Sequence, residues 1–345
     1  MSGGTILALL ALAAFVGAAA ITAQVRRYAL ARNLLDKPNE RSSHTVPTPR
    51  GGGLSIVLAS LIGLAIALGP MNLPDPAAAA LLAGGAAVAA IGWIDDHGHI
   101  RPVARLAAHT AAAVWAVVWL GPIDLAGYGL PPALSGASVA WPVSVLMVAW
   151  LLNLFNFMDG IDGLAASEAA LVAGGSLALL WASSSSLAPG FAAPFAFLAA
   201  SAAGFLMWNW PPARIFMGDA GSGFVGYWIA CLVLLADAIS PAAGATVLIL
   251  AGVFAVDATV TLLHRLVRRD RVFEAHRTHA YQRLARRCGR HLPVTLGSMA
   301  ITVIFLGPLA WLVAAGHLAP LAGLACAYLP LVLAAWLAGA GKPGD

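Results

Sequence analysis

The feature that most constrains this chain is its succession of long apolar segments. About eleven of them are long enough to cross a bilayer, which takes roughly 20 apolar residues in a helix. Only 10% of the 345 residues are charged and 60% are hydrophobic, whereas soluble domains carry roughly 25% charged residues. The runs are continuous, without the alternation typical of a β-barrel. The sequence therefore predicts an all-α polytopic integral membrane protein, one transmembrane domain over residues 1–345, with spans at approximately 5–25, 52–69, 77–94, 103–121, 139–157, 164–182, 191–209, 219–236, 242–264, 293–315 and 318–338.

Positive charges predict how these segments are oriented. If Met1 lies outside and the spans alternate, every one of the 19 lysines and arginines falls in an inside loop or at the adjoining end of a span. This bias is typical of cytoplasmic loops. It accounts for the net charge of +4 without a nucleic-acid partner. The predicted inside segments are about 26–51, 95–102, 158–163, 210–218, 265–292 and the C-terminus.

Four polar residues at three-residue spacing stand at the end of one span: Asn153, Asn156, Asp159 and Asp162. Unpaired carboxylates in hydrocarbon cost several kcal/mol each, so acids here indicate function. Three residues advance a helix by about 300°, so Asn156 and Asp162 cannot serve one pocket from an unbroken helix. We therefore predict a break at Gly160–Gly163 that turns the four side chains into one aqueous pocket.

Two further acidic motifs lie at predicted inner span ends. Asp95 and Asp96 are adjacent, and Asp219 starts a span among Gly218, Gly221 and other glycines. The pair could be hydrated surface charge and Asp219 a helix N-cap. Carboxylates also suit Mg²⁺ binding or proton abstraction. A functional role is favoured for the pair, whereas the local evidence on Asp219 is balanced.

Basic residues suited to phosphate groups stand in two inside segments. Arg50 precedes the glycines of 51–53, where free backbone N–H groups at a helix start can bind an anion. A helix in the segment after residue 264 would place His276 and His279 on one face, with Arg283 on it or beside it. Such a helix could lie on anionic lipid headgroups, clamp a phosphate, or do both.

Two further acids, Glu168 and Asp257, lie inside predicted spans. Glu168 could serve the pocket or form a packing hydrogen bond, and the sequence does not separate these. For Asp257, structural pairing, for example with an arginine, is favoured over a role in the pocket.

Together these clusters form an inventory for phosphoryl transfer. Oxygen ligands favour Mg²⁺ or Mn²⁺ over zinc, and the basic groups suit phosphates. Catalysis then consists mainly of positioning and charge stabilisation. A membrane transporter is the first alternative, but its acids would lie near the middle of the spans. A CDP-alcohol phosphotransferase is the second, but it has fewer spans and a single-helix acid motif that is not seen here.

Four motifs in order resemble the polyprenyl-phosphate N-acetylhexosamine-1-phosphate transferase family (MraY/WecA type; glycosyl transferase family 4). They are Asp95-Asp96, the run from Asn153 to Asp162-Gly-Leu-Ala, Phe216-Met-Gly-Asp219-Ala-Gly-Ser, and the His276/His279 segment. The segments Arg41-Ser-Ser-His44 to Gly53 and Glu274 to Arg283 are similar to its WbpL-like branch, which is used in O-antigen initiation. The resemblance covers roughly residues 36–290.

The resemblance implies transfer of an N-acetyl-sugar 1-phosphate from a UDP-sugar to undecaprenyl phosphate, with Mg²⁺, at the cytoplasmic face of the bacterial inner membrane. The N-terminus would be periplasmic, and a homodimer is suggested by analogy. By motif match, Asp219 and Asn156 would hold the metal, and Asp95 would activate the lipid phosphate with help from Asp96. The residues expected to contact substrates are Arg50, Asn153, Asp159, Asp162, Phe216, His276, His279 and Arg283, with Phe216 near uracil and the two histidines near phosphate or sugar.

Two departures from the family pattern stand out. His99 occupies a position that is often a third aspartate, and Arg277-Thr278 separates the two histidines of the loop. Both lie near loops that handle sugar or phosphate. They therefore bear on the identity of the donor sugar more than on the class of reaction.

Overall fold

The predicted all-α membrane fold is confirmed. The computed structural model describes residues 2–36, 46–98, 100–183, 187–270 and 276–342. Ten helices in this part of the chain are long and apolar enough to cross a membrane. They are α1 (Gly3–Ala31), α2 (Leu54–Met71), the unit α3–η1–α4 (Asp75–Ala78, Ala79–Gly84, Gly85–Gly98), α5 (Pro102–Leu120), α7 (Ala137–Met158), α8 (Leu164–Ser183), α9 (Pro189–Asn209), α10 (Asp219–Asp237), the unit α14–η2–α15 (Leu292–Ala300, Ile301–Leu306, Gly307–Ala314) and α16 (Pro320–Ala338).

Some motif positions lie outside the described residues. These are the first part of the Arg41–Gly53 segment, including His44, together with His99 and Glu274. The other residues predicted to form the site are all described.

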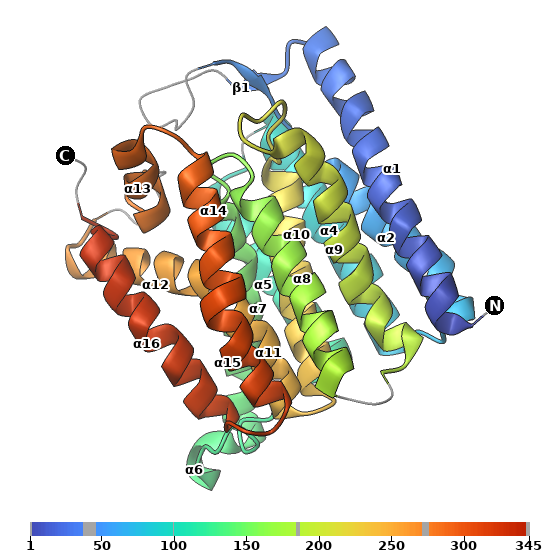
Figure 1. Cartoon of the computed structure of the whole chain (residues 1–345), viewed down its shortest axis with the longest axis vertical. Coiled ribbons are helices and arrows are strands. Elements are labelled where there is room, and N and C mark those ends of the chain that lie inside the picture. The colour runs from blue at the N-terminus through green and yellow to red at the C-terminus, as the bar shows by residue number, and fades with distance from the viewer. Residues whose placement is uncertain (1, 37–45, 99, 184–186, 271–275, 343–345) are drawn as a thin grey trace.

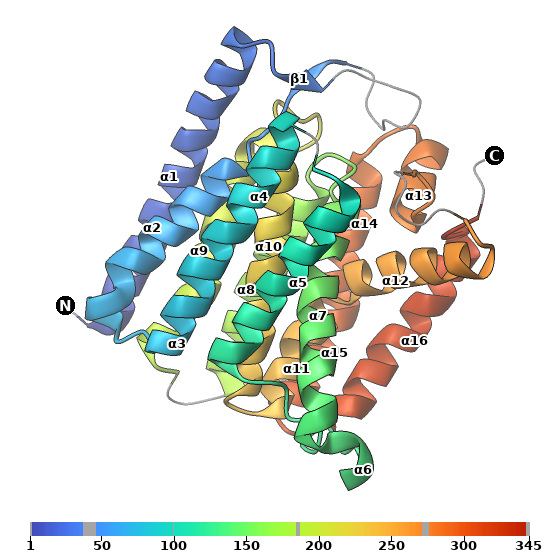
Figure 2. The ribbon, with the colours of Figure 1, turned by 180° about the vertical axis from the view of Figure 1, so that it is seen from behind.

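The span predicted at 242–264 is broken rather than straight. It consists of two helices, α11 (Pro241–Leu250) and α12 (Gly252–Val267), which are bent by 69° at Ala251. A ten-residue helix rises only about 15 Å, half of a hydrocarbon core about 30 Å thick. Figure 2 shows α12 running across the other helices rather than alongside them.

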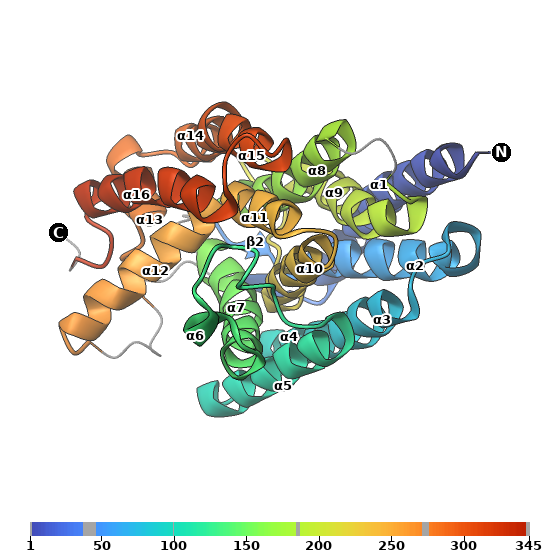
Figure 3. The ribbon, with the colours of Figure 1, turned by 90° about the horizontal axis from the view of Figure 1, so that it is seen from below.

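Helix α10 forms the centre of the bundle. Its membrane window is 94% buried, against 22% for α1 and 17% for α16 at the periphery. Viewed along the bundle, α10 is surrounded by α2, α4, α7, α8 and α11 (Figure 3). Glycines allow this close packing: a Cβ at Gly226 would lie 2.6 Å from the Leu151 carbonyl oxygen of α7. Small residues let helix backbones approach in membranes.

The two ends of the bundle differ in what gathers there. At the end that we call the site end lie the α7–α8 and α9–α10 links, the short helix α13 (Ala280–Cys288) and the antiparallel strands β1 (Leu35–Asp36) and β2 (Thr48–Pro49), in which Leu35 is opposite Pro49. The opposite end, the far end, carries α6 (Pro132–Ser135). Figure 1 shows α1 starting at the far end and α16 finishing at the site end. This placement fits the odd number of crossings predicted from the charges.

Candidate active site

The predicted helix break lies where the sequence placed it. Helix α7 ends at Met158 and α8 begins at Leu164, with Gly163 at φ +74°. This backbone conformation is open to glycine and rarely to other residues. The Gly163 N–H donates to Asn209 Oδ1 at 3.0 Å, which fixes the turn against the end of α9.

The expectation that all four polar side chains enter one pocket is wrong. Asn153 bonds within the helix pair α5–α7, through His109 Nδ1 at 3.1 Å and the Ala149 carbonyl. Asn156 Nδ2 instead donates to Asp219 Oδ1 at 3.0 Å. Asn153, which lies one turn deeper in the helix, therefore has its own partners, whereas Asn156 reaches the start of α10.

Asp162, the last member of the motif, faces a different set of partners. Its carboxylate accepts from the Ala213 N–H at 3.0 Å and lies 3.1 Å from His291 Nδ1. Thr295 Oγ1 donates to its backbone carbonyl at 2.8 Å. The turn after α7 is thus held by the first residues of α14, a contact that the sequence did not indicate.

Asp96 holds the start of α10. Its two carboxylate oxygens accept from the N–H groups of Asp219 and Ala220, each at 3.1 Å. These amides belong to the first turn of the helix and have no partner within it. The approach is possible because α4 has Gly92 there: a Cβ would lie 2.5 Å from the Asp219 carbonyl oxygen. The two acidic motifs are therefore joined directly.

Asp95 is paired with an arginine that the sequence analysis did not single out. Arg105 Nη1 lies 2.7 Å from its Oδ2, and the Ile100 N–H donates to its Oδ1 at 2.7 Å. Asp95 is buried and Arg105 partly exposed. Because the partners are ten residues apart on two helices, no local pattern reveals the pair.

Arg50 lies beside the same acids. Its guanidinium donates to the Asp96 carbonyl and lies 3.7 Å from Asp96 Oδ1. The glycine amides expected to face an anion are already used, since Gly52 and Gly53 donate to the carbonyls of Phe216 and Met217 at 2.8 Å. The arginine remains suited to a phosphate, and the backbone of Gly52 and Gly53 does not.

These residues line a cavity of about 490 Å³ at the site end. We call it the Arg105 cavity; it is lined by Arg50, Asp95, Ile100, Arg101, Pro102, Arg105 and Asp219. The lining therefore includes three arginines and two aspartates. The arginines can bind phosphate groups, and the carboxylates can bind a cation.

Asp159 lies near several other carboxylates, which affect its pKa. Its enclosure by protein atoms, followed by the nearby charges of Asp219, Asp96 and Asp162, raises its pKa well above the ordinary value, against a lowering contribution from the Gly218 backbone. Carboxylates that repel one another are stabilised by a cation.

Carboxylate and amide oxygens are the donors that Mg²⁺ and Mn²⁺ take in proteins. Among the described residues, no three His, Cys, Asp or Glu side chains form a ready metal-binding group. The residues thus fit a divalent ion that completes its coordination with water and substrate oxygens, as Mg²⁺ commonly does.

A second cavity of about 580 Å³ lies beyond Asp162. We call it the Phe216 cavity. It has Phe216 as an aromatic wall and a basic side from the α13–α14 link; its lining comprises Val46, Thr48, Asp162, Pro211, Pro212, Ala213, Phe216, Ala285, Arg286, Gly289, Arg290, His291 and Leu292. An aromatic ring, a fixed carboxylate and cations are the features that a nucleotide requires. Of this basic side, Arg290 and His291 were not predicted as part of the site.

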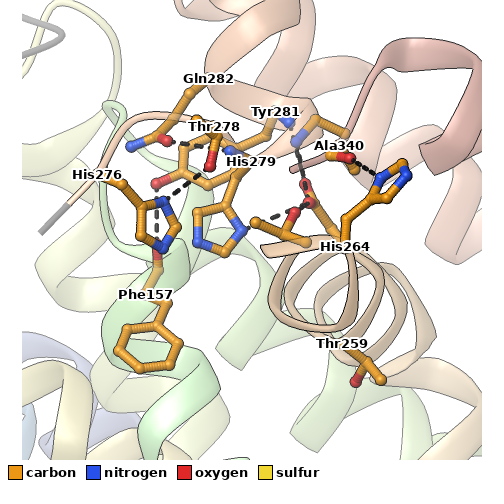
Figure 4. Close-up of polar contacts among 12 residues, drawn as sticks. Phe157, Thr259, His264, His276, Thr278, His279, Tyr281, Gln282 and Ala340 are labelled. Carbon is orange, nitrogen blue, oxygen red and sulfur yellow. Dashed lines mark hydrogen bonds and ion pairs between the residues drawn. The ribbon is translucent and has the colours of Figure 1, made fainter. Parts of the chain in front are cut away.

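The helix expected to carry both histidines is shorter than predicted. α13 begins at Ala280 with His279 as its N-cap, so His276 precedes the helix. The two rings nevertheless stack, with centroids 4.9 Å apart, and His279 also stacks on Phe157 at 6.4 Å (Figure 4). Asp257 is paired, as favoured from the sequence, but with His279 Nδ1 at 3.4 Å rather than with an arginine.

Arg283 lies away from both cavities. It is buried, its Nη1 donates to the Lys342 carbonyl at 3.4 Å, and its Nε packs over Gly339 after α16. The structure therefore places this predicted substrate contact against the C-terminal segment. Glu168, whose role was open, accepts from Thr302 Oγ1 at 3.2 Å in the spans, a packing contact.

Comparisons with known proteins identify a family. The profile of glycosyl transferase family 4 matches residues 78–237. The "Probable undecaprenyl-phosphate N-acetylglucosaminyl 1-phosphate transferase" of Bacillus subtilis is 28% identical over 76% of this chain and 73% of its own length. A phospho-N-acetylmuramoyl-pentapeptide-transferase of Heliobacterium modesticaldum is 30% identical over 64% and 71%. A decaprenyl-phosphate N-acetylglucosaminephosphotransferase of Mycobacterium leprae is 33% identical over 56% and 52%.

The matched residues include three of the four motifs, among them the acids joined at the start of α10 and the turn after α7. On this evidence the chain belongs to glycosyl transferase family 4, the polyprenyl-phosphate N-acetylhexosamine-1-phosphate transferases.

Proposed function

We propose that this protein transfers an N-acetyl-sugar 1-phosphate from a UDP-sugar to undecaprenyl phosphate, giving undecaprenyl-diphospho-sugar and UMP. The product would start O-antigen or another cell-envelope polysaccharide. The observation that carries the proposal is the grouping of Asp96, Asp159 and Asp219 beside Arg50 and Arg105 at one end of a membrane bundle. Relatives named for this chemistry support it.

The reaction makes and breaks one phosphorus–oxygen bond. An oxygen of the lipid phosphate bonds to the phosphorus that carries the sugar. The bond from that phosphorus to the bridging oxygen breaks, and UMP leaves with that oxygen. In a single displacement no protein atom is covalently modified; we favour this course because a pocket that holds both substrates needs no covalent relay.

The two cavities suggest a division of labour. The Phe216 cavity would hold the nucleotide, with uracil near Phe216 and Asp162. The Arg105 cavity would hold the lipid phosphate against Arg50 and Arg105. Asp95 would take the proton of a monoprotonated lipid phosphate, which requires one of its oxygens to leave Arg105 or the Ile100 amide. Asp96 would act by holding the start of α10.

Mg²⁺, or Mn²⁺ in its place, would be held by Asp219 with Asn156 and Asp159 nearby. When bound, it would neutralise the diphosphate and stabilise charge on the departing UMP. Asp219 already bonds Asn156, so its carboxylate is oriented before the ion arrives. The His276–His279 pair would approach phosphate or sugar from the other side of the α7 end.

The test uses purified protein, undecaprenyl phosphate, Mg²⁺ and a panel of UDP-N-acetyl-sugars, with UMP release as the readout. We expect UMP from at least one sugar and none after Mg²⁺ is chelated. Folding is checked in the same sample by its thermal transition. A folded protein that releases no UMP with any sugar would contradict the proposal.

We further propose that the site faces the cytoplasm from a bacterial inner membrane, with the N-terminus in the periplasm. The support is the distribution of lysine and arginine toward the site end. A single cysteine introduced at an exposed position such as Arg287, on α13, in a chain lacking Cys231, Cys288 and Cys326, should be shielded from a membrane-impermeant thiol reagent in whole cells and labelled after lysis. Labelling in intact cells would reverse the orientation.

A further inference from the structure

We propose that Asp257 is a positioning residue for the reaction. Its carboxylate fixes the start of α13 and thereby sets His279 and Tyr281 against the turn that follows α7. The inference rests on the proposed function for its kinetic part, whereas its structural part stands on contacts that can be measured without activity.

The carboxylate of Asp257 accepts hydrogen bonds from the first backbone N–H groups of α13. Its Oδ1 accepts from the Ala280 N–H at 2.9 Å and its Oδ2 from the Tyr281 N–H at 3.0 Å. Thr261 Oγ1 donates to Oδ1 at 3.1 Å. The first N–H groups of a helix have no partner within it. Asp257 is only 6% exposed, and a buried carboxylate is tolerated when donors surround it in this way.

The same carboxylate orients the histidine pair. His279 Nδ1 lies 3.4 Å from Asp257 Oδ1, and the His279 ring stacks with the ring of His276 and with that of Phe157. Figure 4 shows His276, His279 and Phe157 grouped beside α7. An imidazole whose one nitrogen faces a carboxylate presents its other nitrogen in a fixed direction. Because the His276 ring stacks on that of His279, the orientation of His279 also sets that of His276.

Tyr281 connects α13 to the catalytic turn. Its hydroxyl donates to the Phe157 carbonyl at 3.0 Å, one residue after Asn156. A Cβ at Gly160 would collide with this hydroxyl, so a larger residue after Asp159 would displace the phenol. One carboxylate in α12 therefore holds α13, and α13 contacts the turn that presents Asn156 and Asp159.

The contact between Asp257 and α13 matters because of where Asp257 lies in the chain. It lies in the second turn of α12, just after the 69° bend that directs this helix away from α11. α12 packs against α7 and α16. The Asp257 carboxylate adds the polar contact that joins this helix to the start of α13.

Three variants separate positioning from general stabilisation. Asp257→Asn keeps the shape but places an amide N–H₂ where a backbone N–H or His279 needs an acceptor. Tyr281→Phe removes the hydroxyl that bonds the Phe157 carbonyl and that also contacts the Gln282 side chain and the Gly160 backbone. Asp237→Asn is the matched control: Asp237 is also an aspartate with 6% exposure that accepts a backbone N–H, from Asp124 at 2.7 Å, but it lies at the far end.

The first measurement is hydrogen exchange of the α13 amides, which needs no turnover. Asp257→Asn should speed exchange at the start of α13 about tenfold or more, as expected when hydrogen bonds to a charged acceptor are lost. Tyr281→Phe and Asp237→Asn should leave these amides protected. Equal protection in Asp257→Asn and the control would overturn the proposal.

The second measurement is UMP release, separated into kcat and the KM of each substrate. We expect Asp257→Asn to lower kcat about tenfold or more, and Tyr281→Phe to lower it by a smaller factor, with the KM of the UDP-sugar nearly unchanged in both. The control should keep the kcat of the unmodified protein. If Asp257→Asn frees the α13 amides and leaves kcat unchanged, Asp257 is structural only and the positioning role is overturned.

The proposal stays testable if other parts fail. If Asp257→Asn does not fold, Tyr281→Phe decides: an unchanged kcat in that folded variant contradicts the proposal. If the unmodified protein releases no UMP, the proposed function fails, while the exchange measurement still decides whether Asp257 holds α13.

Discussion

The site end and the far end of the bundle both bury aspartates, but they satisfy them differently. At the far end Asp237 accepts the Asp124 N–H at 2.7 Å and lies near Tyr128 and Gly244. At the site end Asp96, Asp159 and Asp219 face one another, and the pKa of Asp159 is raised in part by the other acids. Protein groups hold the far-end carboxylate in place, whereas at the site end the proposed Mg²⁺ would offset the repulsion among the acids. Under the proposed function, this difference separates a structural acid from a functional one.

The strongest test of this comparison is Asp219→Ala. It removes the carboxylate that Asn156 orients in the Arg105 cavity, so we expect turnover to fall about a thousandfold, at the upper end of effects for a single electrostatic contact. The increase in thermal stability caused by Mg²⁺ should vanish as well. A near-normal rate with an intact Mg²⁺ response would remove Asp219 from the metal site.

Asp159→Asn should lower turnover about a hundredfold while making the metal-free protein more stable. An acid whose folded-state pKa is raised binds more protons folded than unfolded between its ordinary value of 3.8 and the raised value. Stability of the metal-free protein should therefore fall as pH rises through that interval. The variant should flatten this dependence in thermal unfolding measured from pH 4 to 8. A dependence unchanged by the substitution would mean that Asp159 does not carry the repulsion.

Arg105→Ala should lower turnover about tenfold to a hundredfold and also destabilise the fold, because it leaves Asp95 buried without its partner at 2.7 Å. The double variant with Asp95→Ala should regain stability but not turnover. Thermal unfolding and UMP release on the same samples give both values. Recovery of turnover in the double variant would show that the pair is structural.

The smallest effect is expected at the far end. Asp237→Asn should cost about 1–2 kcal/mol of stability, because it disturbs a buried hydrogen bond, and should leave turnover and the Mg²⁺ response unchanged. The comparison would break if this variant lost the Mg²⁺ response, since the acids at the two ends would then not be independent.

The sequence predicted the fold through properties that are local to each segment. Span length and hydropathy identify the helices, and the glycines around Asp162 identify the break after α7. The bend at Ala251 escaped because the residues on both sides of it are uniformly apolar, and hydropathy measures composition rather than direction. Such a bend is decided by what α12 contacts after it turns.

For the site, the small number of acidic residues was the most informative feature of the sequence. Acids are rare in this chain, so Asp95, Asp96 and Asp219 stand out, and the structure joins Asp96 to Asp219 at the start of α10. The partners that set their geometry carry no such signal. Arg105 resembles any other basic residue at a span end, and the amides of Gly52 and Gly53 are used by a segment more than 160 residues later. Tertiary contacts of this kind depend on which helices become neighbours.

The proposed reaction depends on the absence of a side chain at Gly92, because this absence lets α4 approach the start of α10. A Cβ there would lie 2.5 Å from the Asp219 carbonyl oxygen, so any other residue would force α4 away from α10. Asp95 and Asp96, carried by the next turn of α4, would move with it and leave Asp219 behind. The proposed reaction would therefore depend on a position that has no functional group of its own. A search for active-site residues by side-chain chemistry passes over such a position, although a substitution there would alter the spacing between the acids as a whole.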